Sequence, residues 1–390
     1  MLLYVFQVLA YSLLIRSEKH FPREGHMNKN KTRWTIIGGG NGGQSLAGHL
    51  SLMGFPVRLY DIFPETVAAI SDQGGIHVKG AVDGFGKLEL ATTDLAKALD
   101  GAEVVMVVAP ATAHKAIAGN CAPLLADGQI VILHPGATCG SLEFRQVLDE
   151  KGCTAKVTLA ETNTLIYACR SPKPGHANIL GIKKDLVLAS IPAKENTKVV
   201  EIFQEAFPQV IAGKNVLQPS LGNANAIVHP GPSLLNTSLI ESKHEWSYYY
   251  DGITPSIGAF VEKLDLERLA LAQAYDVDMI SILDWYRIAY GVDKPTLTEA
   301  VRSNPAYDGI AGQKSLKTRY VMEDIPTGLV PMIELGRLIG VPTPRMELVA
   351  KLGEHLLEED FFATGRTLKN LGLEGMSAKD FQQYLETGNR

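Results

Sequence analysis

The chain has 390 residues, of which 46% are hydrophobic and 20% charged, a composition typical of a globular protein with enough core for two domains. Lys and Arg number 37 against 42 Asp and Glu, and no basic run is interleaved with aromatic residues, so a nucleic-acid partner is not expected. The net charge is −5, and the four cysteines form no C-x-x-C pair and no cluster with histidine, which predicts reduced thiols in a cytoplasmic protein and no metal site.

The first 15 residues, MLLYVFQVLAYSLLI, are apolar enough to suggest a signal peptide or a membrane anchor. Arg16 ends this run about five residues short of the roughly 20 that a spanning helix needs. A basic start and a small-residue cleavage site, which a secretory signal requires, are not evident. Because Met27 lies just before the first predicted strand, we interpret residues 1–26 as an extension, either upstream of the true start or disordered or interfacial. Targeting is the remaining alternative, and no membrane partner is expected.

The stretch TIIGGGNGGQ, residues 35–44, follows an apolar β-branched run and precedes apolar residues with helical spacing. This order predicts a buried strand, a glycine-rich turn and a helix. Gly38, Gly40 and Gly43 match G-x-G-x-x-G, whose glycines allow a tight turn, close approach of a pyrophosphate and close packing of helix on strand. The free N–H groups of a helix N-terminus favour phosphate. We therefore predict a dinucleotide site here, which includes Asn41.

A second predicted strand, PVRLYD, ends at Asp61, 18 residues after Gly43. A carboxylate in this place can accept hydrogen bonds from the ribose hydroxyls of the cofactor and would repel a 2′-phosphate. The plain alternative is a solvated aspartate at a strand end. The carboxylate and the absence of arginine from the stretch DIFPE favour NAD as the cofactor, with NADP as the alternative.

Strand and helix signals alternate through the rest of the first half, as in a Rossmann-type doubly wound parallel sheet. IHVKG and KLELATT form a candidate hairpin, the buried strands EVVMVVAP and QIVILHPG flank a helix at 112–124, and KVTLAET with DLVLASIP widens the sheet. Ligands of such sheets bind outside the carboxyl ends of the strands. The turns 109–114 and 134–140 should therefore face the cofactor, and the contact residues we assign there are Pro110, Pro135 and Gly136.

From about residue 216 the pattern changes to long helical periodicities without a further buried strand. The predicted helices cover residues 256–275, 277–290, 328–340 and 344–359. We therefore predict a dinucleotide-binding Rossmann domain at 27–214 and an all-α substrate-binding and catalytic domain at 215–390.

Polar clusters interrupt these helices, and loops on a rigid scaffold are frequent places for binding and catalytic residues. The clusters are NANAIVHPGP, DGITPS, NPAYDGIAG and TRYVMED. His229, in the first, can exchange a proton near neutral pH, although a buried histidine bonded to a backbone carbonyl is an equal alternative. Arg319 is a candidate for binding a carboxylate and Asp324 for orienting an imidazole, but each alone is more often an ordinary ion-pair partner.

Several motifs together resemble one family. GGGNGG, HPGAT, NANAIVHPGP, DGITPS, NPAYDGIAG and TRYVMEDIPTGLVP are similar to the opine dehydrogenases, in the branch of octopine dehydrogenase and bacterial N-(1-D-carboxyethyl)-L-norvaline dehydrogenase. The resemblance extends from about Met27 to GRTLKNLGL. It implies NAD(H) or NADP(H) on the Rossmann domain and a helical domain that closes over an amino acid and a 2-oxo acid. It also implies that the catalytic histidine is His229, its partner Asp324 and the carboxylate-binding residue Arg319, and we assign Asn225 to substrate binding as well.

The reaction implied is a reductive condensation: a 2-oxo acid and an amine form an imine, which hydride from the nicotinamide reduces to an N-(carboxyalkyl)amino acid. His229 would be the general acid and base, with Asp324 fixing its tautomer. Arg319 would hold a substrate carboxylate and align the carbon that accepts hydride. His134 and His114, in the two turns that should face the cofactor, are equally well explained as structural residues.

Two other kinds of function remain open. Ketopantoate reductase and glycerol-3-phosphate dehydrogenase share the two-domain plan, but they use a lysine general acid in the helical domain. A catalytically inactive dinucleotide sensor would lack the proton-transfer group, whereas His229, Asp324 and Arg319 are all present. The amino acid and the 2-oxo acid depend on the shape of the pocket and are not predicted, and a homodimer is one possible assembly.

Overall fold

The computed structural model describes residues 31–184 and 186–390 of the chain. The predicted N-terminal extension, residues 1–26, lies outside these ranges. Residues Thr32–Arg390 form one packed unit. In the described part of the chain, no helix is long and apolar enough to cross a membrane.

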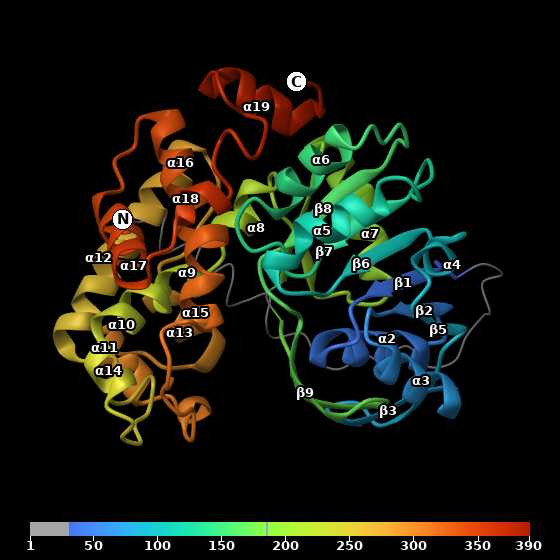
Figure 1. The fold of residues 1–390 in the computed structure, drawn as a ribbon, viewed down its shortest axis with the longest axis horizontal. Coiled ribbons are helices and arrows are strands. Elements are labelled where there is room, and N and C mark those ends of the chain that lie inside the picture. Colours follow the sequence, from blue (N-terminus) through green and yellow to red (C-terminus); the bar gives the residue numbers. More distant parts are fainter. Residues whose placement is uncertain (1–30, 185) are drawn as a thin grey trace. The chain divides into compact units, whose positions relative to one another are not determined.

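An eight-stranded sheet forms the centre of the N-terminal half, with the strand order β12-β11-β8-β7-β6-β1-β2-β5 (Figure 1). Its strands are β1 (Trp34–Ile37), β2 (Val57–Tyr60), β5 (Leu90–Thr92), β6 (Val104–Val107), β7 (Ile130–Leu133), β8 (Thr158–Thr162), β11 (Leu186–Ile191) and β12 (Val210–Ala212). Neighbouring strands are parallel except β8 and β11, which run antiparallel. The predicted doubly wound Rossmann sheet is confirmed, with one antiparallel pair added toward an edge.

The central strands β6 and β7 are apolar at every position because both faces of the sheet are covered. Along β6, Val105 and Val107 belong to one hydrophobic core, whereas Val104 and Met106 belong to the other, as the alternation of side chains requires. The helices of this half are α2 (Asn41–Leu52), α3 (Pro64–Gln73), α4 (Leu95–Leu99), α5 (His114–Cys121), α6 (Gly140–Glu150) and α7 (Asn196–Gln204), with short turns η2 (Ala111–Ala113) and η3 (Ala193–Glu195).

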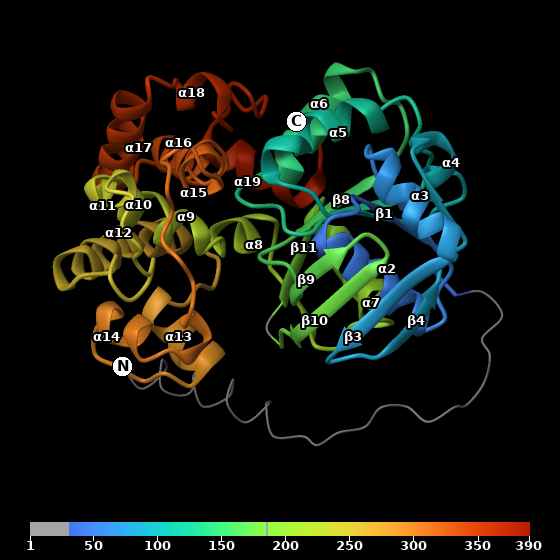
Figure 2. The same cartoon turned by 60° about the horizontal axis from the view of Figure 1, so that its bottom comes forward.

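A second sheet of four strands, in the order β4-β3-β10-β9, packs against α2 (Figure 2). Its strands are β3 (Gly75–Gly80), β4 (Gly84–Lys87), β9 (Tyr167–Lys173) and β10 (His176–Ile182). The predicted hairpin was half right: β3 pairs with β4, whereas the KLELATT segment mostly supplies β5, which pairs with β2. Strands β9 and β10 were not predicted, because the prolines and the glycine of RSPKPG are typical of a loop. Such prolines are tolerated here because β9 is an edge strand.

The C-terminal half is helical, as predicted. Its helices are α8 (Leu217–Leu221), α9 (Asn225–Val228), α10 (Pro230–Leu235), α11 (Thr237–Glu241), α12 (Pro255–Ala274), α13 (Ile282–Tyr290), α14 (Leu297–Arg302), α15 (Arg319–Met322), α16 (Val330–Ile339), α17 (Pro344–Leu357), α18 (Phe361–Thr364) and α19 (Ala378–Thr387), with a turn η4 (Pro305–Tyr307) and a π-helical turn η5 (Ile325–Leu329). The predicted helix at 277–290 begins only at Ile282, because the Ser281 side chain caps it by accepting a hydrogen bond from the Asp284 N–H.

The domain boundary predicted near residue 214 falls between the last strand, β12, and the first helix of the C-terminal half, α8. It stays a prediction, since the two halves share contacts. The C-terminal helix α19 packs against β11 and η3 of the Rossmann half, and one of the two hydrophobic cores contains side chains from both halves.

Candidate active site

The glycine-rich turn between β1 and α2 has two kinds of glycine. Gly38 and Gly43 are required by the protein itself: a Cβ on Gly38 would lie 2.3 Å from the Val108 carbonyl oxygen, and one on Gly43 would lie 1.7 Å from the Gly38 carbonyl oxygen. Gly40 has an ordinary extended backbone, and a Cβ there would meet nothing within 4 Å. The space in front of Gly40 adjoins the first-turn N–H groups of α2, which no side chain caps. These residues fit the pyrophosphate of a dinucleotide.

Asp61 is buried at the end of β2 and does not fit the alternative of a solvated strand end. Its Oδ2 accepts a hydrogen bond from the Gly39 N–H, and its Oδ1 accepts one from the Phe63 N–H at 2.9 Å. The carboxylate is thereby held against the glycine-rich turn, with acceptor capacity left for a ribose hydroxyl. A Cβ on Gly39 would lie 2.8 Å from Asp61 Oδ2, which explains a third glycine of the turn.

Two side chains join the glycine-rich turn to the second sheet. Asn41, assigned from sequence to cofactor binding, uses its Oδ1 to accept a hydrogen bond from the Ser171 N–H of β9 at 2.7 Å. Gln44 donates from Nε2 to the Gly39 carbonyl at 2.6 Å and accepts at Oε1 from the Gly175 N–H at 2.7 Å. The sequence analysis missed Gln44, because its partners are backbone groups that have no sequence signature.

His229 and Asp324, which are 95 residues apart in sequence, meet in the C-terminal half. Nδ1 of His229 lies 2.7 Å from Oδ2 of Asp324, and both side chains are buried. His229 stands at the junction of α9 and α10, where Pro230 begins the new helix, and Asp324 directly precedes η5. With Nδ1 donating to the carboxylate, a neutral ring carries its lone pair on Nε2, and no described residue hydrogen-bonds that atom.

Two tyrosine rings enclose the imidazole. Tyr320 stacks on it, with ring centroids 3.7 Å apart and an interplanar angle of 3°. Tyr248 lies edge-on at 6.2 Å, and its hydroxyl donates to the His229 carbonyl oxygen at 2.9 Å. Burial raises the pKa of Tyr320 and raises that of Tyr248 well above its usual range. Both phenols therefore stay neutral at physiological pH.

Asn225 begins α9, which ends just before His229, and Arg319 begins α15, which ends two residues before Asp324. The Arg319 side chain is 65% exposed, and its Nη2 contacts Oε1 of Glu323 at 2.9 Å. Burial raises the pKa of Glu323, which the neighbouring guanidinium opposes. Asn225 is exposed, and its backbone oxygen accepts from the His229 N–H at 3.0 Å. Both side chains are thus accessible to solvent, and Arg319 is paired with Glu323.

The two histidines of the turns predicted to face the cofactor are neutral and fully hydrogen-bonded. His134 donates from Nδ1 to Thr162 Oγ1 at 2.7 Å and accepts at Nε2 from the Ile166 N–H at 3.1 Å. His114 donates from Nε2 to the Ala109 carbonyl at 3.3 Å. Burial lowers the pKa of each ring to about 3. These contacts favour a structural role over a catalytic one.

The other residues assigned to the two turns differ in exposure. Pro110 is exposed and Pro135 half-buried, at the carboxyl ends of β6 and β7. Gly136 is buried, and a Cβ there would lie 2.6 Å from the Glu161 Cβ. Contact with the Glu161 side chain therefore explains why position 136 has no side chain, and no cofactor contact is needed to account for it.

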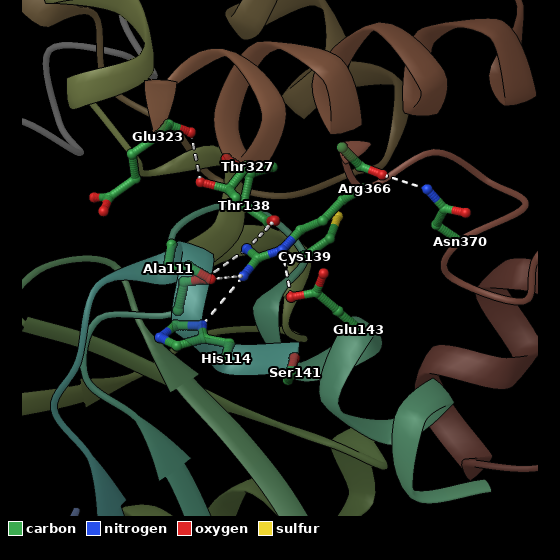
Figure 3. Close-up of polar contacts among 12 residues, drawn as sticks. Ala111, His114, Thr138, Cys139, Ser141, Glu143, Glu323, Thr327, Arg366 and Asn370 are labelled. Atoms are coloured by element: carbon green, nitrogen blue, oxygen red, sulfur yellow. Dashed lines mark hydrogen bonds and ion pairs between the residues drawn. The ribbon is translucent and has the colours of Figure 1, made fainter. Parts of the chain in front are cut away.

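The sequence analysis also missed Arg366, whose side chain is 0% exposed and whose guanidinium connects both turns (Figure 3). It donates to the backbone carbonyls of the turns and to two side chains: Gly136 O (2.9 Å), Thr138 O (2.7 Å), Ala111 O (3.4 Å), Glu143 Oε2 (3.0 Å) and His114 Nδ1 (3.1 Å). Its backbone N–H donates to the Pro326 carbonyl in η5. Thr138 N–H donates in turn to the Thr327 carbonyl at 3.0 Å. The turns after β6 and β7 are thus bonded to the segment that directly follows Asp324.

Comparison with known proteins agrees with this arrangement. The family model for the alpha-helical domain of NAD/NADP octopine/nopaline dehydrogenase matches residues 212–357, and that for the N-terminus of NAD-dependent glycerol-3-phosphate dehydrogenase matches residues 33–152. A structure of octopine dehydrogenase in complex with NADH and agmatine shares the fold, with a TM-score of 0.77 at 21% identity over 92% of this chain and 99% of that one.

Two curated relatives match along nearly their whole length. Protein ocs of Agrobacterium tumefaciens (strain Ach5) is 26% identical over 88% of this chain and 96% of its own. An opine dehydrogenase of Arthrobacter sp. (strain 1C) is 42% identical over 361 residues, which are 92% of this chain and 100% of that protein. The chain therefore belongs to the opine dehydrogenases, a family of NAD(P)-dependent oxidoreductases.

Proposed function

We propose that His229, supported by Asp324, transfers the proton in an opine dehydrogenase reaction, the NAD(P)H-dependent reductive condensation of a 2-oxo acid with the amino group of an amino acid. The observation that carries this proposal is the 2.7 Å contact between His229 Nδ1 and Asp324 Oδ2 in a buried position. The contact leaves Nε2 as the group that can exchange a proton with a substrate.

Condensation requires the carbonyl oxygen of the 2-oxo acid to leave as water. The amine attacks the carbonyl carbon, and one of its two protons moves to the oxygen, which gives a carbinolamine. The protonated His229 ring gives the hydroxyl oxygen a second proton, so that water departs and a protonated imine remains. When bound, the nicotinamide cofactor supplies the hydride that converts the protonated imine to the secondary amine. In the reverse direction the neutral ring accepts the proton. In both directions Asp324 accepts the hydrogen bond from Nδ1–H, and it stabilises the ring while the ring is protonated.

The amine dependence of the reaction distinguishes this proposal from the alternatives. NADH oxidation should be screened over a matrix of 2-oxo acids and amino acids. An opine dehydrogenase oxidises NADH only when both substrates are present, whereas a ketopantoate-reductase-like enzyme needs no amine. A dinucleotide sensor would bind NADH without oxidising it in any combination.

We further propose that Arg319 binds a substrate carboxylate, since its guanidinium is largely exposed one helical turn from Asp324. Arg319→Ala should raise the KM of that substrate by about 10- to 100-fold, the range that a hydrogen bond to a charged group represents. Some loss of kcat should accompany it, because the reacting carbon would be less well aligned. Arg337→Ala, which removes a half-exposed arginine paired with Glu334 and Glu347, is the matched control. An unchanged KM for both substrates would contradict the assignment.

We propose NADH as the preferred cofactor, because the Asp61 carboxylate faces the glycine-rich turn and would repel a 2′-phosphate. Asp61→Ala should lower the preference for NADH, measured as kcat/KM with NADH divided by kcat/KM with NADPH, by about tenfold or more. A tenfold change corresponds to a charge effect of roughly 1.4 kcal/mol. Asp72→Ala, an exposed aspartate of α3, is the control. Equal efficiency of the two cofactors with the unmodified protein would disprove the preference.

We also propose that the protein is cytoplasmic. All four cysteines are free thiols, which suits a reducing compartment.

We propose as well that the protein is a homodimer. Three exposed leucines on α12 and α17 offer apolar surface to a second copy: Leu266, Leu348 and Leu356. Light scattering of the purified chain measures the assembly directly.

A further inference from the structure

Tyr320 makes a contact with His229 that the proposed proton transfer does not by itself require. The two rings are parallel within 3° and their centroids are 3.7 Å apart, closer than most aromatic pairs. Tyr248 stands edge-on to both rings, at 6.2 Å from the imidazole and 4.9 Å from the phenol of Tyr320. The imidazole is thus fixed by a hydrogen bond at Nδ1, a ring on one face and a ring at one edge.

One short segment supplies both main contacts of the imidazole. Tyr320 lies in α15 and Asp324 four residues later, a spacing that puts two side chains on the same side of a helical turn. The Asp324 N–H donates to the Arg319 carbonyl, which continues that turn. The carboxylate at Nδ1 and the ring on the face are therefore set by a single local geometry.

Stacking also has an electrostatic consequence. The face of a phenol ring carries negative potential, so it attracts the positively charged imidazolium more than the neutral imidazole. The titratable groups that contact the imidazole are Asp324, Tyr248 and Tyr320, and both phenols stay neutral because burial raises their pKa. Beyond them, Arg319 is paired with Glu323. The stacked Tyr320 ring therefore stabilises the protonated imidazole, as the Asp324 carboxylate also does.

We propose that Tyr320 is a positioning residue of the reaction. Its ring holds the plane of the His229 imidazole, so that Nε2 keeps one direction toward the substrate, and it stabilises the protonated ring. The aromatic face performs both tasks, and the hydroxyl is not needed for either. This inference rests on the proposed role of His229 as the proton donor.

The test compares Tyr320→Phe, which keeps the stacked ring, with Tyr320→Leu, which removes it. Tyr320→Leu should lower kcat about tenfold, since a small misplacement of a reacting group costs one to two orders of magnitude, and should leave the KM for NADH within about twofold. Tyr320→Phe should have a kcat within about twofold of that of the unmodified protein. Tyr290→Leu is the matched control, because Tyr290 contacts Trp285, Tyr286 and Tyr307 but not His229.

A second measurement does not depend on turnover. NMR relaxation of the His229 ring in the full chain reports how firmly the imidazole plane is held, and it should show more ring motion in Tyr320→Leu than in Tyr320→Phe. Equal kcat losses in the Phe and Leu variants would overturn the inference, as would unchanged ring motion in Tyr320→Leu. Normal turnover in His229→Ala would instead refute the proposed function, while the ring motion would still report whether Tyr320 holds the imidazole.

Discussion

His229→Ala is expected to lower kcat by about 10²- to 10⁴-fold, the usual contribution of a general acid and base. The dissociation constant of NADH should change little, since the residues that fit the dinucleotide lie in the β1–α2 turn and at Asp61, in the other half of the chain. Stopped-flow measurement of imine reduction and NADH titration by fluorescence separate the two quantities. Near-normal kcat in the variant would remove the mechanism.

Variants of Asp324 test whether this residue acts through His229. Asp324→Asn keeps the size of the side chain but allows the amide to favour the wrong imidazole tautomer, so it should lose rate through the same step. The double variant His229→Ala/Asp324→Asn should be only slightly slower than His229→Ala, because residues that act as a unit are strongly non-additive. Fully multiplicative losses would mean that the two residues act separately.

The Rossmann half was predictable because its signals are local. The strand, glycine-rich turn and helix at residues 34–52 follow one another in sequence. A Gly43 Cβ would clash with the Gly38 carbonyl of the same turn, although the clash at Gly38 is with the remote Val108 carbonyl. The His229–Asp324 contact is different. No local pattern brings together residues 95 positions apart. Their helix-breaking polar clusters indicated His229 for proton exchange and Asp324 for orienting an imidazole, and the resemblance to a family indicated that the two residues are partners.

The residues that were not predicted mostly contact backbone groups. Gln44 bonds a carbonyl and an N–H, and Arg366 bonds three carbonyls that lie between 228 and 255 residues earlier in the chain. Every residue carries such groups, so a backbone partner leaves no trace in the sequence. Tyr320 had a weak signal, its spacing of four from Asp324, but the partner on which it stacks is again remote.

Arg366→Met is expected to lower the free energy of unfolding by about 3–5 kcal/mol, the range for removing one partner of a buried ion pair. The guanidinium is fully buried and pairs with the Glu143 carboxylate at 3.0 Å. Its loss would leave that carboxylate and the Thr138 carbonyl without their donor (Figure 3). The Gly136 carbonyl would lose its donor as well. Urea unfolding followed by tryptophan fluorescence measures the change.

Three further variants show where this energy comes from. Arg366→Lys keeps the charge but has three donors instead of five and no planar fork, so it should lose an intermediate amount. Adding Glu143→Gln to Arg366→Met should recover part of the loss, since the unpaired buried charge is then gone. Arg337→Met, which removes a half-exposed arginine paired with Glu334 and Glu347, should cost no more than about 1 kcal/mol. A loss in Arg366→Met as small as in Arg337→Met would mean that the two turns after β6 and β7 hold their positions without the guanidinium.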